Sequence, residues 1–324
     1  MRQLSVSALR ERLLQYKLVQ GPLAGVSSVP FRDLIWRFSQ PAWVYSEMIS
    51  CQTILSGSLE IRHRYCQTSA TEGPLVMQIA ASDADTCARA CVVLNQLDIS
   101  MIDLNVGCPV KKIRKRGQGS KLLSDPERLR AVLQALRDHS RHPISVKIRV
   151  DGHSSDAYNA QVLSVVNAVG PDFLVVHGRH YQDGYDVPCH LSQIAFFAQH
   201  ATMPVIGNGD VCDAASAQAM LATGCVGAMI ARASVGAPWL IGQIQQAMQL
   251  VTGAQTLDTQ QSYAIFCEHM AGLSHMLGSE RHALNHARGL IKYYAKRNHY
   301  SKALIARVHM ADCLADLNYA DIAI

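Results

Sequence analysis

Short apolar runs recur along the chain up to about residue 230, and each is followed by polar or glycine-rich residues and then by apolar positions at helical spacing. Such runs predict buried strands, and the segments between them predict helices. The expected strands are residues 17–20, 43–45, 75–79, 101–104, 145–148, 173–176, 205–206 and 227–230. Several expected helices open with an aspartate suited to an N-cap, namely residues 83–97, 125–139, 156–169 and 213–223.

Strict alternation of strands and helices predicts a parallel sheet with helices outside it. Eight such units within about 235 residues favour a closed (β/α)8 TIM barrel over an open doubly wound sheet. A Rossmann-type fold is the alternative. It is disfavoured because Gly117-Gln-Gly119 is followed by Leu122 where a third glycine is needed, and because this segment follows a basic loop instead of a strand.

The two ends of the chain differ from this alternating pattern. From residue 258 onward the strand pattern stops, and three helices are expected, with breaks near residues 278–279 and near Asn298. This predicts a catalytic barrel over residues 1–252 and a small helical domain over residues 253–324. Residues 5–15 predict a short amphipathic helix. An organellar transit peptide is disfavoured there, because it would carry more Arg and Ser over a longer span.

Composition describes a globular protein whose charge is unevenly placed. With 324 residues and 49% hydrophobic side chains the chain can build a large core. A net charge of +5 is too small to identify a nucleic-acid partner, so the location of the charge matters more. Two tracts without any acid concentrate it: residues 111–121, with Lys111, Lys112, Arg114, Lys115, Arg116 and Lys121, and residues 281–307, with Arg288, Lys292, Lys296, Arg297 and Lys302. Both predict an RNA-binding surface.

Ten cysteines without regular spacing predict reduced thiols in a cytoplasmic protein. Cys87 and Cys91 are expected to pack in the core, as are Cys51, Cys66, Cys189, Cys212, Cys225, Cys267 and Cys313. His282 and His286 are spaced like a metal-binding pair but lack a third ligand, so no metal site is expected. No run approaches the roughly 18 apolar residues of a membrane helix.

In a (β/α)8 barrel the loops at the C-terminal ends of the strands carry function. Here those positions are rich in glycine and polar side chains. Small residues allow backbone N–H groups to approach a phosphate, and an arginine balances its charge, so residues 208–210 and 231–232 after the last two strands predict a flavin phosphate site. Lys147 could place positive charge at the edge of the flavin ring where negative charge develops on reduction, and Gln78 could bond its polar edge.

Taken together, these segments resemble the tRNA-dihydrouridine synthase family over nearly the full chain. The matching motifs are residues 22–25 (Pro-Leu-Ala-Gly), 78–80 (Gln-Ile-Ala), 103–109 (Asp-Leu-Asn-Val-Gly-Cys-Pro), 119–120 (Gly-Ser), 146–149 (Val-Lys-Ile-Arg), 176–179 (Val-His-Gly-Arg), 206–210 (Ile-Gly-Asn-Gly-Asp) and 231–232 (Ala-Arg). The resemblance implies FMN bound at the top of the barrel, NADPH as reductant, and reduction of a uridine C5=C6 bond in tRNA. No membrane and no obligate protein partner are expected.

Matched motif by motif, the resemblance implies that Cys108 donates the proton to C5, and a thiol with a pKa near 8.5 is protonated at neutral pH. It assigns Asn105 and Arg149 to the uracil or to the shape of the site. Basic residues expected to contact tRNA are Lys111, Lys112, Arg114, Arg116, Arg288 and Lys292. Residues expected to bind the flavin are Pro22, Leu23, Ala24, Gln78, Lys147, His177, Asn208, Gly209, Asp210, Ala231 and Arg232.

The chain departs from the family pattern at several positions. Ala231 stands where the family usually has glycine, Lys121 where relatives tend to have alanine, and His180 where threonine is usual; residues 188–190 (Pro-Cys-His) replace an acidic-Trp pair. Two alternatives stay open. One is a flavin-dependent reductase of a free pyrimidine of the dihydroorotate type. The other is a catalytically weakened barrel that binds RNA.

Overall fold

The computed structural model describes residues 3–152 and 156–317, and it contains a closed parallel barrel. Strand β1 (Leu18–Gln20) pairs with both β2 (Val44–Tyr45) and β9 (Gly227–Ile230), and β2 continues to β4 (Leu75–Ala80). The circle is completed by β5 (Met101–Asn105), β6 (Ile144–Arg149), β7 (Phe173–His177) and β8 (Val205–Asn208). The predicted (β/α)8 barrel is confirmed. An additional short strand, β3 (Ile49–Ser50), pairs with the end of β4 and was not expected.

Helices fill the connections between the strands. The N-caps at Asp83, Asp125 and Asp213 are confirmed, because each carboxylate accepts a bond from a backbone N–H of the first turn, whereas Asp156 makes no such bond. The barrel helices are α2 (Val29–Ser39), α3 (Cys51–Ser56), α4 (Leu59–Cys66), α5 (Ala84–Leu94), α6 (Lys111–Lys115), α7 (Pro126–His139), α8 (Ala157–Val169), α9 (Leu191–His200), α10 (Ala214–Leu221) and α11 (Leu240–Ala247).

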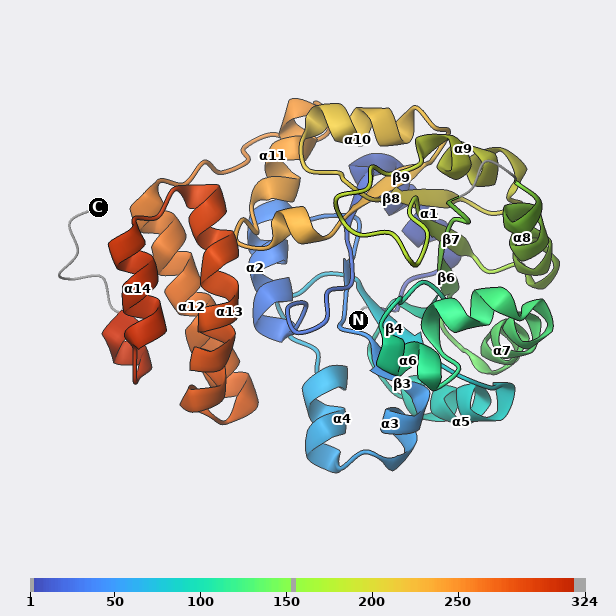
Figure 1. The fold of residues 1–324 in the computed structure, drawn as a ribbon, viewed down its shortest axis with the longest axis horizontal. Coiled ribbons are helices and arrows are strands. Elements are labelled where there is room, and N and C mark those ends of the chain that lie inside the picture. Colours follow the sequence, from blue (N-terminus) through green and yellow to red (C-terminus); the bar gives the residue numbers. More distant parts are fainter. Residues whose placement is uncertain (1–2, 153–155, 318–324) are drawn as a thin grey trace.

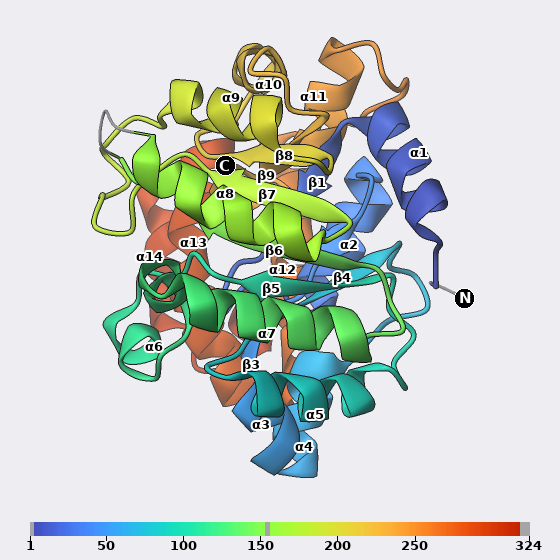
Figure 2. The same cartoon turned by 90° about the vertical axis from the view of Figure 1, so that its right-hand side faces the viewer.

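The expected N-terminal helix is present as α1 (Val6–Tyr16), and it closes one end of the barrel. Leu9 and Leu13 are fully or almost fully buried and join the interior cluster that also contains Trp43 and Phe173, whose rings meet edge-on at 5.3 Å. Figure 2 shows α1 beside the barrel at the end opposite α6. The apolar plug keeps this end of the interior dry and leaves the other end for polar chemistry.

Three C-terminal helices form their own apolar cluster. They are α12 (Thr259–Leu277), α13 (Glu280–Asn298) and α14 (Lys302–Met310), and the expected breaks appear at left-handed residues Gly278 and His299. Tyr263, Phe266 and Tyr294 lie at the centre of this cluster. In Figure 1 the three helices stand together on one side of the barrel, with α2 and α11 between them and the strands. The domain boundary at residues 252–253 stays a prediction.

A buried ion pair fixes the segments that lead to the top of the barrel. Arg32 on α2 and Glu72 before β4 are almost completely buried, with 2.5 Å between Nε and Oε2. Arg32 also donates to the carbonyls of Ser27 and Gln67, and Glu72 accepts from the backbone N–H of Ser69. Removing one partner would leave the other charge buried without compensation.

We therefore expect Glu72→Ala to lower the free energy of unfolding by about 3–5 kcal/mol. The exposed pair of Arg37 and Glu268, also between a barrel helix and another segment, provides the control. Glu268→Ala should cost about 0–1 kcal/mol, because water already screens that pair. Urea titration of both variants measures the difference, and equal costs would contradict the role of the buried pair.

Candidate active site

A cavity of about 810 Å³ opens at the C-terminal ends of the strands. It is lined by every residue predicted to bind the flavin, together with Cys108, Asn105 and Arg149. Leu23, Val26, Met48, Met229 and Val235 supply apolar wall. Cavities of roughly 300–1,000 Å³ with apolar walls and a few converging polar groups are typical of small-molecule and cofactor sites.

Cys108 follows β5 and is held by its own backbone. The Asn105 side-chain oxygen accepts from the N–H of Cys108 at 2.9 Å and from the N–H of Gly107 at 3.2 Å. Gly119 packs against this turn with φ 60°, and a Cβ there would lie 2.8 Å from the Cys108 carbonyl oxygen. Burial raises the pKa of the half-buried thiol, although Arg149 and Lys147 act in the opposite direction. Cys108 is therefore a protonated thiol at neutral pH, which suits a proton donor.

Lys147 brings a positive charge to the floor of the cavity. Its Nζ donates to the side-chain oxygen of Asn208 at 2.9 Å, and the Asn208 amide donates to the carbonyl of Met229 at 3.0 Å. Burial lowers the pKa of Lys147, as does Arg149, while Asp103 raises it. Asn208 thus links β6, β8 and β9 and fixes where the ammonium group lies.

His177 at the end of β7 is 8% exposed and lies among cations. Burial, followed by the charges of Lys147, Arg149, Arg179 and Arg232, holds its pKa far below the ordinary value. Its imidazole is therefore neutral at physiological pH. It can offer a hydrogen bond without adding another charge to the site.

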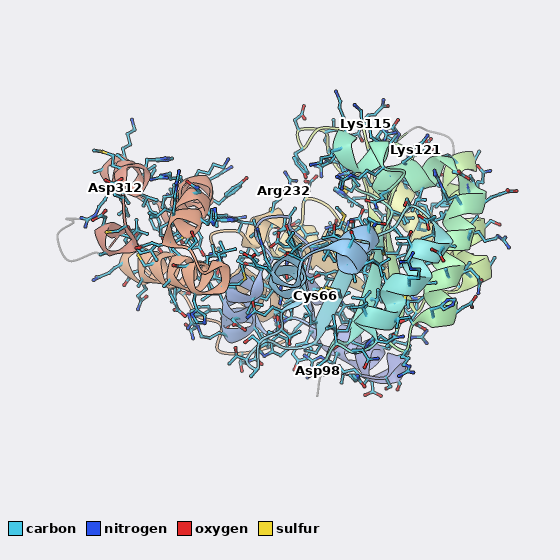
Figure 3. The ribbon with its side chains drawn as sticks, turned by 90° about the horizontal axis from the view of Figure 1, so that it is seen from below. Cys66, Asp98, Lys115, Lys121, Arg232 and Asp312 are labelled. Atoms are coloured by element: carbon cyan, nitrogen blue, oxygen red, sulfur yellow. The ribbon has the colours of Figure 1, made fainter. Side chains whose placement is uncertain are left out.

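Asp210 organises the rim near β8. It has φ 56°, and both carboxylate oxygens accept from Nη2 of Arg179 at 2.6 Å. Arg232 approaches the same carboxylate at 3.5 Å and lies 3.7 Å from the centroid of the Tyr185 ring. Figure 3 shows Arg232 between the C-terminal helices and the end of the barrel that carries Lys115 and Lys121, with Asp98 at the opposite end.

Comparison with known proteins agrees with this geometry. Residues 18–320 match the family model described as "Dihydrouridine synthase (Dus)". The chain belongs to the dihydrouridine synthase family. Together with the barrel, this membership indicates an oxidoreductase.

Curated relatives and a solved structure extend the comparison. "tRNA-dihydrouridine synthase B" of Pseudomonas syringae pv. tomato is 32% identical over 257 residues, 79% of this chain and 76% of the relative. The protein of the same name from Pseudomonas aeruginosa is 30% identical over 292 residues, 90% of this chain and 87% of the relative. Morphinone reductase, solved in complex with tetrahydroNAD, shares the fold at a TM-score of 0.50 and 11% identity, covering 74% of this chain and 91% of that chain.

The segment that follows Cys108 forms a short helix, α6, where a loop was expected. Lys111, Lys112 and Arg116 are exposed on it, whereas the Arg114 guanidinium lies 3.9 Å from the centroid of the Tyr181 ring in the β7–α9 connection. Of the four residues predicted to contact tRNA here, three therefore face solvent, as does Lys115, and Arg114 packs against the barrel loop instead.

On α13, too, one predicted tRNA contact binds protein groups and the other is exposed. Arg288 donates to the carbonyls of His309 and Ala311, so it holds the end of α14, while Lys292 is exposed beside the Tyr293 ring. Residues that sequence reasoning did not assign to the site complete the rim: Tyr185, Tyr293, Lys296 and Arg297. Lys296 and Arg297 belong to the basic tract that predicted RNA binding. Nothing in the sequence, however, indicates that this turn of α13 faces the barrel.

Cysteine positions correct one expectation. Cys87 and Cys91 are buried as predicted, but Cys212 is exposed and lines the cavity, so its prediction as a core residue is wrong. Its position directly after the β8 loop explains the exposure. Within residues 3–152 and 156–317, no group of three or more His, Cys, Asp or Glu side chains could hold a metal ion. No helix in that part of the chain is long and apolar enough to span a membrane.

Proposed function

We propose that this protein is a tRNA-dihydrouridine synthase that uses FMN as its cofactor and NADPH as its reductant. The observation that carries the proposal is the half-buried Cys108 thiol, whose pKa burial raises, in a cation-lined cavity of cofactor size at the end of the barrel. Family membership supplies the reaction class. The curated relatives, named for action on tRNA, support the substrate.

The residues that are present fit a flavin mononucleotide. Arg232 and the short turn after β9 lie where barrel phosphate sites usually form, and Asp210 keeps the arginine in place. Lys147, Asn208, His177 and Gln78 face the space where a ring system would lie, beside the apolar wall. Ala231 narrows the approach to the phosphate by one methyl group but still lines the open cavity.

Bound flavin would supply the hydride that C6 of uridine receives, and NADPH would restore that pair of electrons. The protein's own part is the proton. Cys108 gives its Sγ proton to C5 as the C5=C6 bond becomes a single bond, and Arg149 and Lys147 stabilise the resulting thiolate electrostatically. The thiolate then takes a proton from solvent. One NADPH, one proton and one uridine are consumed for each dihydrouridine.

Two basic surfaces flank the cavity and suit a folded RNA. Lys111 and Lys112 of α6, with Arg116 directly after it, lie on one side. On the other side Lys296 and Arg297 of α13 line the cavity, and exposed Lys292 lies one turn before them. Arg114 and Arg288 would hold these two segments in position by their contacts with protein groups. A uridine must leave the stacked helix to reach the floor of the cavity, and cations on both sides would hold the flanking phosphates during that movement.

The alternatives make different demands on the structure. A free pyrimidine needs no cations from α13, yet Lys296 and Arg297 line the cavity itself. An RNA-binding protein without catalysis needs no half-buried thiol in the floor. Turnover on tRNA but not on free uridine or orotate would exclude the free-pyrimidine reductase. Bleaching of bound flavin by NADPH would exclude the RNA-binding protein without catalysis.

Cys108→Ala should retain flavin, but its rate of dihydrouridine formation should fall at least about 100-fold, because a general acid accelerates a reaction by that factor or more. NADPH should still bleach the flavin of this variant. Cys313→Ala, which removes a partly buried thiol from the helical end of the chain, is the matched control. Mass spectrometry of tRNA incubated with each enzyme measures the product, and full activity of Cys108→Ala would remove the thiol from the mechanism.

Lys296→Glu should raise the KM for tRNA about tenfold with little change in kcat, because the change affects phosphate binding and leaves the proton donor in place. The salt dependence of binding should weaken by about one unit of slope. Lys302→Glu makes the same charge change at an exposed position of α14 that does not line the cavity. Similar effects of both substitutions would indicate a general charge effect and not a specific RNA contact.

A further inference from the structure

Asp103 is a completely buried carboxylate in the middle of β5, below the cavity. The strand register places it beside Gln78 of β4 and Ser145 of β6, so the three side chains lie on the same face of the sheet, inside the barrel. Asn105 and Lys147 follow two residues later on β5 and β6 and, like Gln78, line the cavity. A buried carboxylate is costly unless it is fully bonded, so its partners are informative.

Both oxygens of Asp103 accept hydrogen bonds. The Ser145 hydroxyl donates to Oδ1 at 2.6 Å, and the Gln78 amide nitrogen donates to Oδ2 at 2.8 Å. Burial raises the pKa of Asp103 to about 6, while these two bonds and Lys147 act in the opposite direction. At neutral pH the group is therefore ionised and can accept hydrogen bonds but not donate them.

The orientation of one amide then determines the next. With its nitrogen bound to Asp103, Gln78 turns its oxygen to Asn105 and accepts from the Asn105 amide nitrogen at 2.9 Å. Asn105 consequently turns its own oxygen to the backbone N–H groups of Gly107 and Cys108. If either amide rotated by 180°, donors would face donors and acceptors would face acceptors, and each lost bond would leave an almost completely buried polar group unsatisfied.

We propose that Asp103 is a positioning residue that holds Cys108 in place through Gln78 and Asn105, a role that rests on the proposed function of Cys108 as proton donor. The carboxylate never reaches the substrate. It sets the direction of two amides, and the second amide fixes the turn that presents the thiol. Asp103 accepts only at one end of this chain of bonds, and the backbone N–H groups of Gly107 and Cys108 donate only at the other, so the two amides between them have a single satisfied orientation.

This arrangement also determines what the cavity floor can recognise. Gln78 and Asn105 each use their oxygen within the chain of bonds, so each has an N–H group left to present to the cavity. Together with the Lys147 ammonium, the floor offers donors. The floor is therefore complementary to ring carbonyl oxygens, those of the flavin at Gln78 and Lys147 and those of uracil at Asn105. It would oppose a ring that presents an amino group at the same place.

The reactivity of the Cys108 thiol tests this directly in the flavin-loaded enzyme. Asp103→Leu keeps the branched shape but removes both acceptors, and Asp103→Asn keeps polarity but has one carbonyl oxygen to divide between Gln78 and Ser145. Alkylation of Cys108 by iodoacetamide, followed by peptide mass spectrometry, should be about tenfold faster in the Leu variant and intermediate in the Asn variant, because the turn loses its anchor. Tyr45→Phe removes a buried hydroxyl that lies near Asp103 and Ser145 but is not one of the two donors to the Asp103 carboxylate, and it should match the unmodified protein within about twofold.

Kinetics separate a positioning role from a general structural one. In single turnovers, reduction of the flavin by NADPH should change by less than about threefold in Asp103→Asn, whereas its oxidation by tRNA should slow at least about tenfold with the KM for tRNA unchanged. Alkylation rates of both Asp103 variants equal to that of Tyr45→Phe would overturn the proposal. If the unmodified enzyme does not act on tRNA, the proposed function fails, but the alkylation result still decides whether Asp103 positions the thiol.

Discussion

Closure of the parallel barrel is the constraint on which the rest of this structure depends. Because all eight strands point the same way, their C-terminal ends meet at one rim, and residues as distant as Pro22 and Arg232 line a single cavity. Closure also makes the interior dry, and α1 seals its other end with Leu9 and Leu13. Every polar group placed inside must then find a partner there. The bonds among Ser145, Asp103, Gln78 and Asn105 are the consequence, and they give the active-site floor its fixed geometry.

Closure of the barrel also brings several positive charges together. Lys147, Arg149, Arg179 and Arg232 converge near the cavity, and Asp210 is the one acid among its described lining residues. Burial, together with their summed field, keeps His177 neutral, and the field favours an anionic ligand and an electron-rich ring. The thiol of Cys108 lies in the same field, yet burial outweighs the cations and raises its pKa. One region can thus bind a phosphate and still keep a proton available at sulfur. The basic faces of α6 and α13 continue this field outward, towards the partner that the proposed function requires.

Much of this could be predicted from the sequence, because periodicity and N-caps report local structure and a barrel brings strand ends together by necessity. All predicted cofactor residues line the cavity for that reason. Contacts between distant segments could not be predicted. Tyr293, Lys296 and Arg297 reach the cavity because of how α13 packs against the barrel, and Arg288 of the same basic tract turns away to bind the end of α14. The two-residue strand β3 and the short helix α6 depend on tertiary partners and carry too few residues to show a period.

The most direct test of the proposed function is the mass-spectrometric mapping of dihydrouridine in tRNA from cells with and without this protein. Specific uridines should be unmodified when the protein is absent, and supplying the protein should restore dihydrouridine at those positions. Purified protein with NADPH should produce the same modification on the unmodified tRNA. An identical dihydrouridine map with and without the protein, together with no product from the purified protein on that tRNA, would contradict it.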